Sequence, residues 1–301
     1  MNKKIIQKKI ARQSSKKKKA DVFLVEKFQM TRSQAQKKIK SELVFVNNKP
    51  VESKTLIAVN DEVVIRDKKK NTPRKPLEII FEDKHLIVID KPTGLSSHPA
   101  PGENEPTISE ILAERLYISD DKDFPGIVHR LDKGTSGIMI LAKTAETKKD
   151  LQDQFKKRKI TKKYLALIEG KIKPEKGIID LPIKREKNNR EKMGINVEGR
   201  SAKTKYIVKK KFAKYSLLEL IPETGRTHQI RVHLSAIGFP IVGDVRYGKK
   251  SDFVDRIFLH ATKISFIHPK TKKQLTFESP LPKTLAKALS NLDSIEEEAR
   301  N

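Results

Sequence analysis

The apolar residues of this chain gather in short runs, and no unbroken run is longer than the five residues from Ile138 to Ala142. A membrane-spanning helix needs about 18 or more consecutive apolar residues, so we expect no membrane span. Short runs rich in Ile, Val and Leu are typical of buried strands. The chain is therefore expected to fold mainly into strands around a water-excluded core.

The order of the expected elements indicates the fold class. Strand-like segments outnumber helical ones and do not alternate with them regularly, which favours a mixed or antiparallel α+β fold. Helices are expected near Ile108 to Leu116, from Ala145 to Lys156, and from Thr227 to Gly238. Strands are expected in LEIIFED, HLIVID, on both sides of the loop in GIVHRLDKGTSGIMILAKT, and in YLALIEG, KTKYIVKKKF, YSLLELIP, ISFIHP and QLTFESP.

Composition shifts along the chain predict its domains. Residues 1–20 hold nine Lys/Arg and no acid, and a block of like charges is expected to form a flexible basic arm. Residues 21–67 form a small module, and 68–76 (KKKNTPRKP) have the composition of a linker. The main domain spans 77–285, and 286–301 are left as a tail.

The small module has its own local signals. A short helix is expected from Asp21 to Phe28, and Thr31 is a candidate N-cap for a second helix, with Gln34 at the capping-box position. Two strands, LVFVNN and DEVVIRD, are expected to be joined by a turn at Asn47-Asn48.

The charge balance indicates the kind of partner. The chain has 65 Lys+Arg against 38 Asp+Glu, a formal net charge of +27, and such a surplus attracts polyanions. Nucleic acid is the expected partner; the alternative is a lysine-rich surface that only keeps the protein in solution. With no cysteine there is no disulfide frame and no thiolate metal site. The basic N-terminus has no apolar segment after it, so we expect a cytoplasmic protein.

One carboxylate stands in a loop of small and hydroxyl residues, HRLDKGTSG, between two apolar segments. The glycines and hydroxyls predict a tight loop with Asp132 facing outward, and its neighbours Arg130 and Lys133 favour the ionised form. An ionised, positioned carboxylate can act as a nucleophile or a base. From these residues alone, the alternative is an Asx-turn that only shapes the loop.

A second cluster, ETGRTHQIRVH, opens the helix expected from residue 227. His228 and Arg231 are three residues apart and share a helix face. His228 and His233 lie about 140° apart around the axis, so their spacing predicts no shared metal. A buried Arg231 would need a carboxylate partner, and Asp132 is available; the alternative is an ordinary cationic helix on a surface facing RNA.

Two further residues, Tyr164 and Lys91, could have either a structural role or a role in the site. Tyr164 in KKYLALIEG lies on one face of an expected strand, where a tyrosine is more often part of the core than of an active site. Lys91 opens the loop KPTG after HLIVID, where a plain turn is the alternative.

Together these segments resemble the RluA/RluD family of pseudouridine synthases. HRLDKGTSGIMILAKT matches the family's catalytic segment without a gap, and the other matching segments, in the family's order, are EDKHLIVIDKPTGLSSHP, KKYLALIEGKI, LPIKREKNNREKM, TGRTHQIRVHLSAIGFPIVGDVRYG and LHATKISFIHP. Residues 21–67 resemble the ribosomal-protein-S-four-like RNA-binding module that is often attached to these enzymes. The chain departs from the family in its basic arm and in the two serines before His98, where the family usually has an aliphatic pair.

The resemblance implies a cofactor-free isomerisation of uridine within RNA. Asp132 matches the catalytic aspartate, which would attack the sugar or the uracil ring, or take a sugar proton. Tyr164 matches the tyrosine that stacks on uracil, for which help in removing the ring-carbon proton is a second role that the resemblance leaves open. Arg231 matches the arginine that pairs with the aspartate, and Arg130 matches the residue expected to fill the stack vacated by a flipped nucleotide. A place in the RNA cleft is implied for His129, Thr135, Lys91, Arg226 and His228.

We therefore expect a monomeric RNA pseudouridine synthase that acts on large-subunit ribosomal RNA without metal or coenzyme. A transfer-RNA substrate is the alternative within the enzyme class. A non-catalytic RNA-binding or ribosome-assembly protein is the alternative in a different class.

Overall fold

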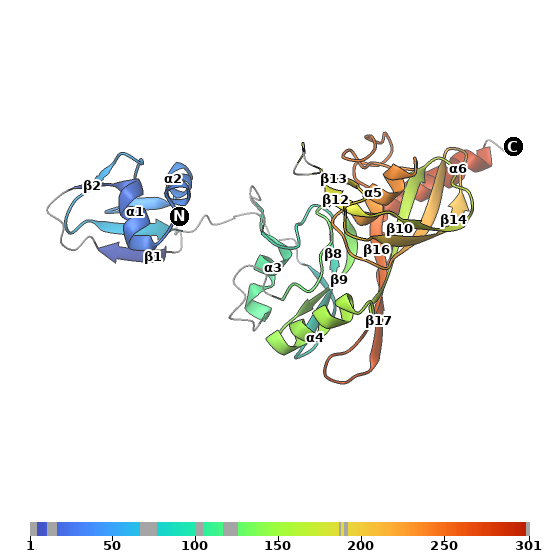
Figure 1. Cartoon of the computed structure of the whole chain (residues 1–301), viewed down its shortest axis with the longest axis horizontal. Coiled ribbons are helices and arrows are strands. Elements are labelled where there is room, and N and C mark those ends of the chain that lie inside the picture. Colours follow the sequence, from blue (N-terminus) through green and yellow to red (C-terminus); the bar gives the residue numbers. More distant parts are fainter. Residues whose placement is uncertain are drawn as a thin grey trace. The chain divides into compact units, whose positions relative to one another are not determined.

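The structure, a computed structural model, describes residues 5–10, 17–66, 77–99, 105–116, 126–186, 188–189 and 192–298 (Figure 1). The chain divides into two compact units, Met1–Thr72 and Pro73–Asn301. Each unit has a hydrophobic core of its own. The expected linker at 68–76 lies outside the described residues.

Unit 1 combines two short helices with small antiparallel sheets. Its elements are β1 (Ile5–Ile10), β2 (Lys18–Lys19), α1 (Ala20–Phe28), α2 (Arg32–Lys40), β3 (Val44–Val46), β4 (Lys49–Pro50), β5 (Leu56–Ile57) and β6 (Glu62–Arg66). One sheet has the order β1-β6-β3-β4, and β2 pairs with β5. Both expected helices are present, and the capping box is confirmed: the Thr31 hydroxyl accepts from the Gln34 N–H (3.3 Å), and the Gln34 side chain accepts from the Thr31 N–H (2.8 Å).

The prediction of a flexible arm over residues 1–20 is wrong for the described part of that segment. Ile5–Ile10 forms strand β1, antiparallel to β6, and Lys18–Lys19 pairs with β5. Strand β1 is an edge strand, and lysines are common there because edge side chains reach water. Backbone pairing therefore orders a segment in which like charges alone predicted disorder.

The turn at Asn47-Asn48 is present, but it joins β3 to β4 rather than to DEVVIRD. Both asparagines have positive φ (48° and 67°), as a tight hairpin turn requires. The DEVVIRD segment forms β6 and pairs with the other edge of β3. Both segments form strands as expected and pair with each other, but the predicted connection between them is wrong.

Unit 2 is built on a nine-stranded sheet, which confirms the mixed, mostly antiparallel α+β class. The order is β11-β14-β15-β10-β16-β9-β8-β7, with β17 paired to β16. Its strands are β7 (Glu78–Glu82), β8 (Leu86–Lys91), β9 (Ser136–Ala142), β10 (Thr161–Glu169), β11 (Lys176–Asp180), β14 (Lys203–Lys211), β15 (Tyr215–Pro222), β16 (Leu259–Ile267) and β17 (Gln274–Glu278). A separate hairpin joins β12 (Ile183–Arg185) and β13 (Met193–Ile195).

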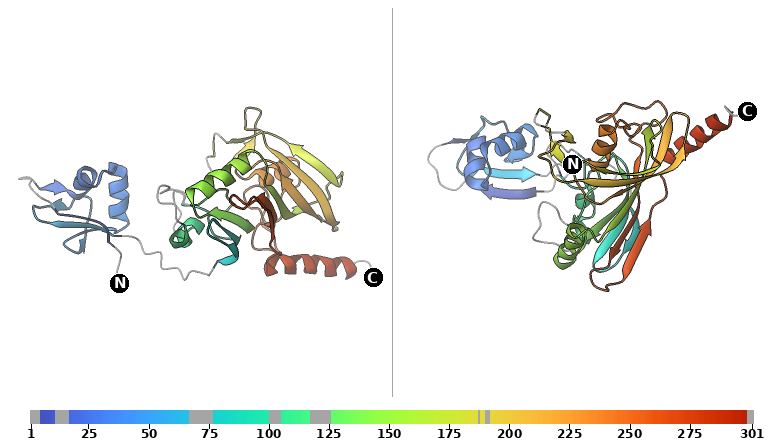
Figure 2. Two further views of the ribbon diagram at one scale, coloured as in Figure 1. Left: turned by 90° about the horizontal axis from the view of Figure 1, so that it is seen from below. Right: turned by 45° about the vertical axis from the view of Figure 1, so that its right-hand side comes forward.

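The short apolar runs are strands buried on both faces. In β9, Met139 and Leu141 join one hydrophobic cluster, whereas Ile138 and Ile140 join the cluster on the other face. Helix α4 (Ala145–Lys156) packs Leu151 on the second cluster. Helices α3 (Ile108–Ile111), α5 (Gln229–Ala236) and α6 (Lys283–Glu298) contribute to the first, and α4 and α6 lie at opposite ends of the sheet (Figures 1 and 2).

Three predictions in unit 2 need correction. The segment before the HRLDKG loop forms only a single bridge, Ile127 to Leu141, instead of a strand. The helix expected from 108 to 116 is α3 followed by a 3-10 turn, Ala113–Arg115. The supposed tail is mostly helix α6, because Leu285, Ala288 and Leu292 form an apolar stripe that packs on the main core.

Gly137 allows the one parallel pairing in the large sheet, between β9 and β16. Its φ is +114°, and a Cβ there would lie 2.2 Å from the Ala261 carbonyl oxygen. Only glycine tolerates both the backbone angle and the close approach. This contact fixes the strand that immediately follows the Asp132 loop.

The substitution Gly137→Ala should lower the free energy of unfolding by about 4 kcal/mol or more, because the methyl group collides with backbone. Gly238→Ala is the matched control: its φ is +86° with nothing within 4 Å of the added Cβ, so only backbone strain of about 1 kcal/mol is expected. Urea unfolding followed by circular dichroism measures both. Equal losses would show that the close approach to Ala261 has no role.

Candidate active site

The loop that carries Asp132 is held at its backbone from several directions. The buried Ser97 hydroxyl donates to the Leu131 carbonyl (2.9 Å) and accepts from the Leu131 N–H (3.2 Å). Arg256 donates to the Gly134 carbonyl (3.2 Å) and to the Ser136 hydroxyl (2.8 Å). The loop on which Asp132 lies is therefore positioned before any ligand arrives.

Arg231 on α5 joins two carboxylates. Its Nε and Nη2 donate to Asp244 (2.7 and 2.8 Å), and its Nη1 donates to Asp132 Oδ2 (3.1 Å). Burial alone would lower the pKa of Arg231, but the hydrogen bonds and charges of Asp244 and Asp132 raise it above its ordinary value. The predicted pairing of Arg231 with Asp132 is present. Asp244 is a second carboxylate partner of the same guanidinium.

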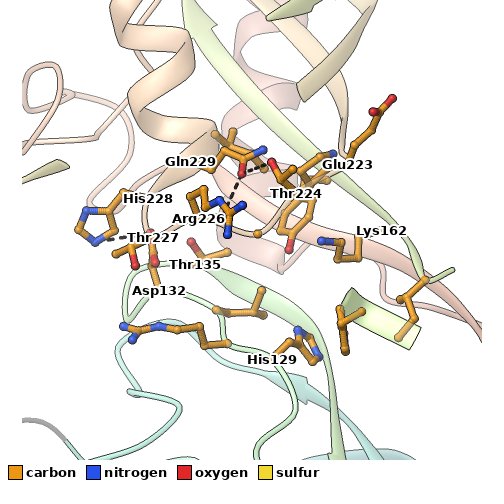
Figure 3. Close-up of a pocket in the computed structure, with 18 of the residues that line it drawn as sticks. His129, Asp132, Thr135, Lys162, Glu223, Thr224, Arg226, Thr227, His228 and Gln229 are labelled. Carbon is orange, nitrogen blue, oxygen red and sulfur yellow. Dashed lines mark hydrogen bonds and ion pairs between the residues drawn. The ribbon is translucent and has the colours of Figure 1, made fainter. Parts of the chain in front are cut away.

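His228 adds a second nitrogen beside Asp132. Its Nε2 lies 3.9 Å from Asp132 Oδ2 (Figure 3). Its Nδ1 lies 2.8 Å from the Tyr247 hydroxyl. That hydroxyl also accepts from the Met193 N–H, so Tyr247 connects His228 to the β13 backbone. Burial is the largest influence on His228 and lowers its pKa, so the ring is neutral at neutral pH.

Both polar contacts of the Asp132 carboxylate within the described chain are made by Oδ2. Its other oxygen, Oδ1, therefore remains available for a substrate. A carboxylate oriented by a guanidinium on one oxygen can act as a nucleophile or base with the other.

A cavity of about 350 Å³ opens beside this carboxylate, within the range of small-molecule sites. Tyr164, 8% exposed, projects into it from β10. Burial, with the charge of Asp132, raises the pKa of the Tyr164 hydroxyl, so the phenol stays protonated. The lining also includes the side chains of His129, Arg130, Thr135, Lys162, Arg226, His228 and Arg231.

The segment before α5 closes the far side of the cavity. The Gln229 amide oxygen accepts from the Arg226 N–H (3.0 Å) and the Thr224 hydroxyl (2.6 Å) (Figure 3). Arg226 also donates through Nε to the Ser201 carbonyl (3.1 Å). Helix α5 starts at Gln229 with His228 as its left-handed N-cap, two residues later than expected.

Comparison with known proteins identifies the chemistry. The family model described as RNA pseudouridylate synthase matches residues 85–236. "Uncharacterized RNA pseudouridine synthase YlyB" of Bacillus subtilis is 38% identical over 87% of this chain and 89% of its own length. "Ribosomal large subunit pseudouridine synthase D" of Nitrosomonas europaea is 42% identical over 73% of this chain and 66% of its own length. The chain belongs to the RluA/RluD family of RNA pseudouridine synthases.

A solved structure agrees with this assignment. "Human RNA Pseudouridylate Synthase Domain Containing 1" is 27% identical, has a TM-score of 0.58, and covers 74% of this chain and 95% of its own. Within the described residues of this synthase, no helix combines the length and hydropathy of a membrane span. Its reaction is an isomerisation, in which no atom of the uridine is lost overall.

Eight of the nine site residues expected from the sequence line the cavity of the synthase. The exception is Lys91, which is fully buried and donates to the Pro92 and Leu95 carbonyls (3.0 and 2.9 Å). Burial lowers its pKa to about 7. Its expected place in the RNA cleft is wrong, because its ammonium group anchors the turn that follows β8.

His129 lines the cavity but also has a structural role. Its Nε2 accepts from the Ile140 N–H (2.9 Å), and its ring lies against Phe155 at 4.9 Å between centroids. Burial and the charge of Lys162 lower its pKa to about 3. The neutral ring therefore connects the Asp132 loop to β9.

Several residues of the site were not expected from the sequence. Asp244 was part of a recognised segment, GDVRYG, without being assigned a role, and Lys162 lies two residues before Tyr164, at a spacing that shares a strand face. Burial lowers the pKa of Lys162 to about 8. The two hydrogen bonds between the Ser97 hydroxyl and the Leu131 backbone were not predicted. In the sequence, Ser97 was noted only as one of two serines where the family usually has an aliphatic pair.

The substitution His129→Gln should make the fold less sensitive to acid. The folded pKa of about 3 lies below the ordinary 6.5, so between these values the unfolded chain binds a proton that the folded chain does not, and stability is lost as the pH falls. Between about pH 7.5 and pH 5, the wild type should lose about 1–2 kcal/mol more than the variant in urea unfolding. The glutamine amide oxygen can still accept from Ile140. Identical pH profiles would contradict this role.

Proposed function

We propose that this synthase converts specific uridines of large-subunit ribosomal RNA to pseudouridine, with Asp132 as the catalytic group and the target base extruded into the Tyr164 cavity. The observation that carries the proposal is the ionic contact of Asp132 with Arg231 in the lining of that cavity. Relatives named as ribosomal large-subunit synthases, 37–42% identical to this chain, support the substrate class.

The chemistry needs one oriented carboxylate. The bond from uracil N1 to C1′ of the ribose breaks, a bond from C5 to C1′ forms, C5 loses its proton, and N1 gains one. Asp132 Oδ1 would attack the sugar or the ring, or remove a sugar proton, and each route requires the ionised carboxylate that Arg231 stabilises.

Tyr164 and Arg130 complete the proposed handling of the base. Because Tyr164 stays protonated, we assign it to packing against the uracil rather than to removing the C5 proton. Arg130 is exposed at the cavity rim, 3.3 Å from the His98 ring nitrogen, where it can enter the RNA stack that the base leaves. Extrusion costs a few kcal/mol, which such contacts offset.

The substitution Asp132→Asn should lower the rate of uridine conversion by about 10⁴-fold or more, while the affinity for RNA stays within a few fold of the wild type. Release of tritium from RNA labelled at uracil C5 measures the reaction directly. Asp153→Asn, on the exposed side of α4, is the matched control and should react like the wild type. Full conversion by Asp132→Asn would show that Asp132 is not the catalytic group. Absence of conversion of any cellular RNA by the wild type would overturn the proposal in favour of a non-catalytic RNA-binding protein.

We also propose that unit 1 is an S-four-like module that docks RNA. It carries 20 Lys+Arg against 7 Asp+Glu, and α2 alone has basic residues at Lys37, Lys38 and Lys40 in its last turn. Such a surface binds phosphates independently of sequence.

Deletion of residues 1–72 should weaken RNA binding and flatten its dependence on salt. Each lost phosphate contact lowers the slope of log K against log salt by about 0.7–0.9. The double variant Lys37→Gln/Lys40→Gln tests the same idea in the intact chain, where both lysines are exposed, and should lower the slope by up to about 2 units. Unchanged affinity and slope in both proteins would remove unit 1 from RNA binding.

A further inference from the structure

Lys162 is a lysine of the Tyr164 cavity to which the proposed reaction assigns no role. It stands two residues before Tyr164 on β10, so the two side chains leave the same face of the strand, and both residues line the cavity. Its amino nitrogen lies 5.8 Å from the centre of the Phe155 ring and 4.0 Å from the position that a Cβ on Gly225 would take. Phe155 and Gly225 line the same cavity, so the amino group itself belongs to the cavity wall.

The amino group of Lys162 has no acid beside it. Within the residues that the structure describes, no hydrogen bond or ion pair joins it to another group, and burial alone lowers its pKa, to about 8. The neighbouring Lys163 leaves the opposite face of β10 and pairs with Glu219 at 3.1 Å. Glu223, an acidic residue of the cavity lining, lies 2.8 Å from Lys205 and points away from Lys162 (Figure 3). At pH 7 about a tenth of the molecules therefore carry the uncharged amine.

The proposed reaction leaves one proton without an acceptor. Once C5 of the base has bonded to C1′ of the ribose, C5 still carries its proton, which must leave before pseudouridine is complete. Burial, with the charge of Asp132, raises the pKa of Tyr164, and its neutral phenol is a weak base. His129 is also a weak acceptor, because burial lowers its pKa to about 3 and its Nε2 already accepts from the Ile140 N–H. An uncharged amine is a stronger base than either group.

The remaining groups of the lining are less suited to this proton. Asp132 and His228 lie 3.9 Å apart, and the proposed function already uses that carboxylate in the exchange of bonds at the sugar. The arginines of the lining keep their protons. Lys156, the other lysine that lines the cavity, is exposed at the end of α4. Lys162 is thus the amine held within the cavity wall beside Tyr164.

We propose that Lys162, which shares its cavity and its strand face with Tyr164, is the general base that removes the proton from C5 after the new carbon–carbon bond has formed. This inference rests on the proposed function. The Nζ lone pair takes the proton, and the C5–H electron pair forms the C5=C6 double bond. The electron pair of the C6=N1 double bond moves to N1, which takes a proton from water. Lys162 is partly exposed, so its ammonium group can then return the proton to water.

Two substitutions separate a base from a charge. Lys162→Arg keeps the positive charge but does not give up its proton near neutral pH, whereas Lys162→Met removes both charge and base. Both variants should convert uridine about 10²–10⁴-fold more slowly than the wild type, the usual contribution of a general base. Lys163→Gln is the matched control: it removes a lysine from the opposite face of β10 together with an ion pair to Glu219, and it should react like the wild type.

RNA labelled at uracil C5 shows which step has slowed. With 5-deuterated uridine, Lys162→Met and Lys162→Arg should show a larger deuterium isotope effect on the single-turnover rate than the wild type, because breaking the C5–H bond then limits the reaction. A lysine that only binds a phosphate or packs against the base would slow other steps and leave the isotope effect unchanged.

A single introduced thiol tests the amine itself. The chain has no cysteine, so Lys162→Cys provides one site for alkylation. Bromoethylamine restores an amine at the length of lysine, whereas (2-bromoethyl)trimethylammonium attaches a fixed cation that has no lone pair. The first product should convert uridine at least about 10-fold faster than the unmodified variant, and the second should not. Both products derive from the same folded variant, so a folding defect does not explain a difference between them.

The outcomes separate this inference from the proposed function. Conversion by Lys162→Arg at the wild-type rate, or equal recovery with the amine and the trimethylammonium group, would overturn the inference, because a charge would then be sufficient. A slow variant with the isotope effect of the wild type would also overturn it and would assign Lys162 to binding. Absence of conversion of any RNA by the wild type would instead refute the proposed function.

Discussion

The contact on which the site depends is the guanidinium of Arg231 between two carboxylates. Asp244, with its side chain 1% exposed, takes two of the hydrogen bonds and leaves one for Asp132. Breaking a buried pair of this kind leaves an uncompensated charge and costs about 3–5 kcal/mol. Because Asp244 supplies most of the compensation, Arg231 orients Asp132 without depending on it alone for neutralisation, as the proposed catalytic role of Asp132 requires.

The sheet brings these groups together from distant parts of the chain. Asp132 precedes β9, whereas Arg231 and Asp244 belong to α5 and the loop after it. The parallel pairing of β9 with β16 at Gly137 fixes the start of β9. Behind it, the Ser136 hydroxyl lies 2.9 Å from the His260 ring, so the backbone that presents Asp132 is held by a polar network within the core.

Local signals in the sequence predicted much of this fold. Helix α4 has the expected bounds because Thr144 caps it and its apolar side has a helical period. Strand β1 was missed because it is stabilised by pairing with β6, more than 50 residues away. Helix α6 was missed because its apolar residues are buried only by packing on the core of unit 2. In the site, Asp132, Tyr164 and Arg231 followed from family motifs. The role of Asp244 did not follow from a motif, because Asp244 meets Arg231 only where the loop after α5 turns back toward the helix.

Burial also decides which cations can act in the site. It lowers the pKa of Lys91 to about 7 and that of Lys162 to about 8, and it lowers the pKa of His228, so each of these groups loses charge readily. A guanidinium does not deprotonate under such conditions. The guanidinium of Arg231 beside Asp132 therefore keeps its charge at a depth where burial lowers the pKa of a lysine or histidine, which is a physical reason for an arginine at this position.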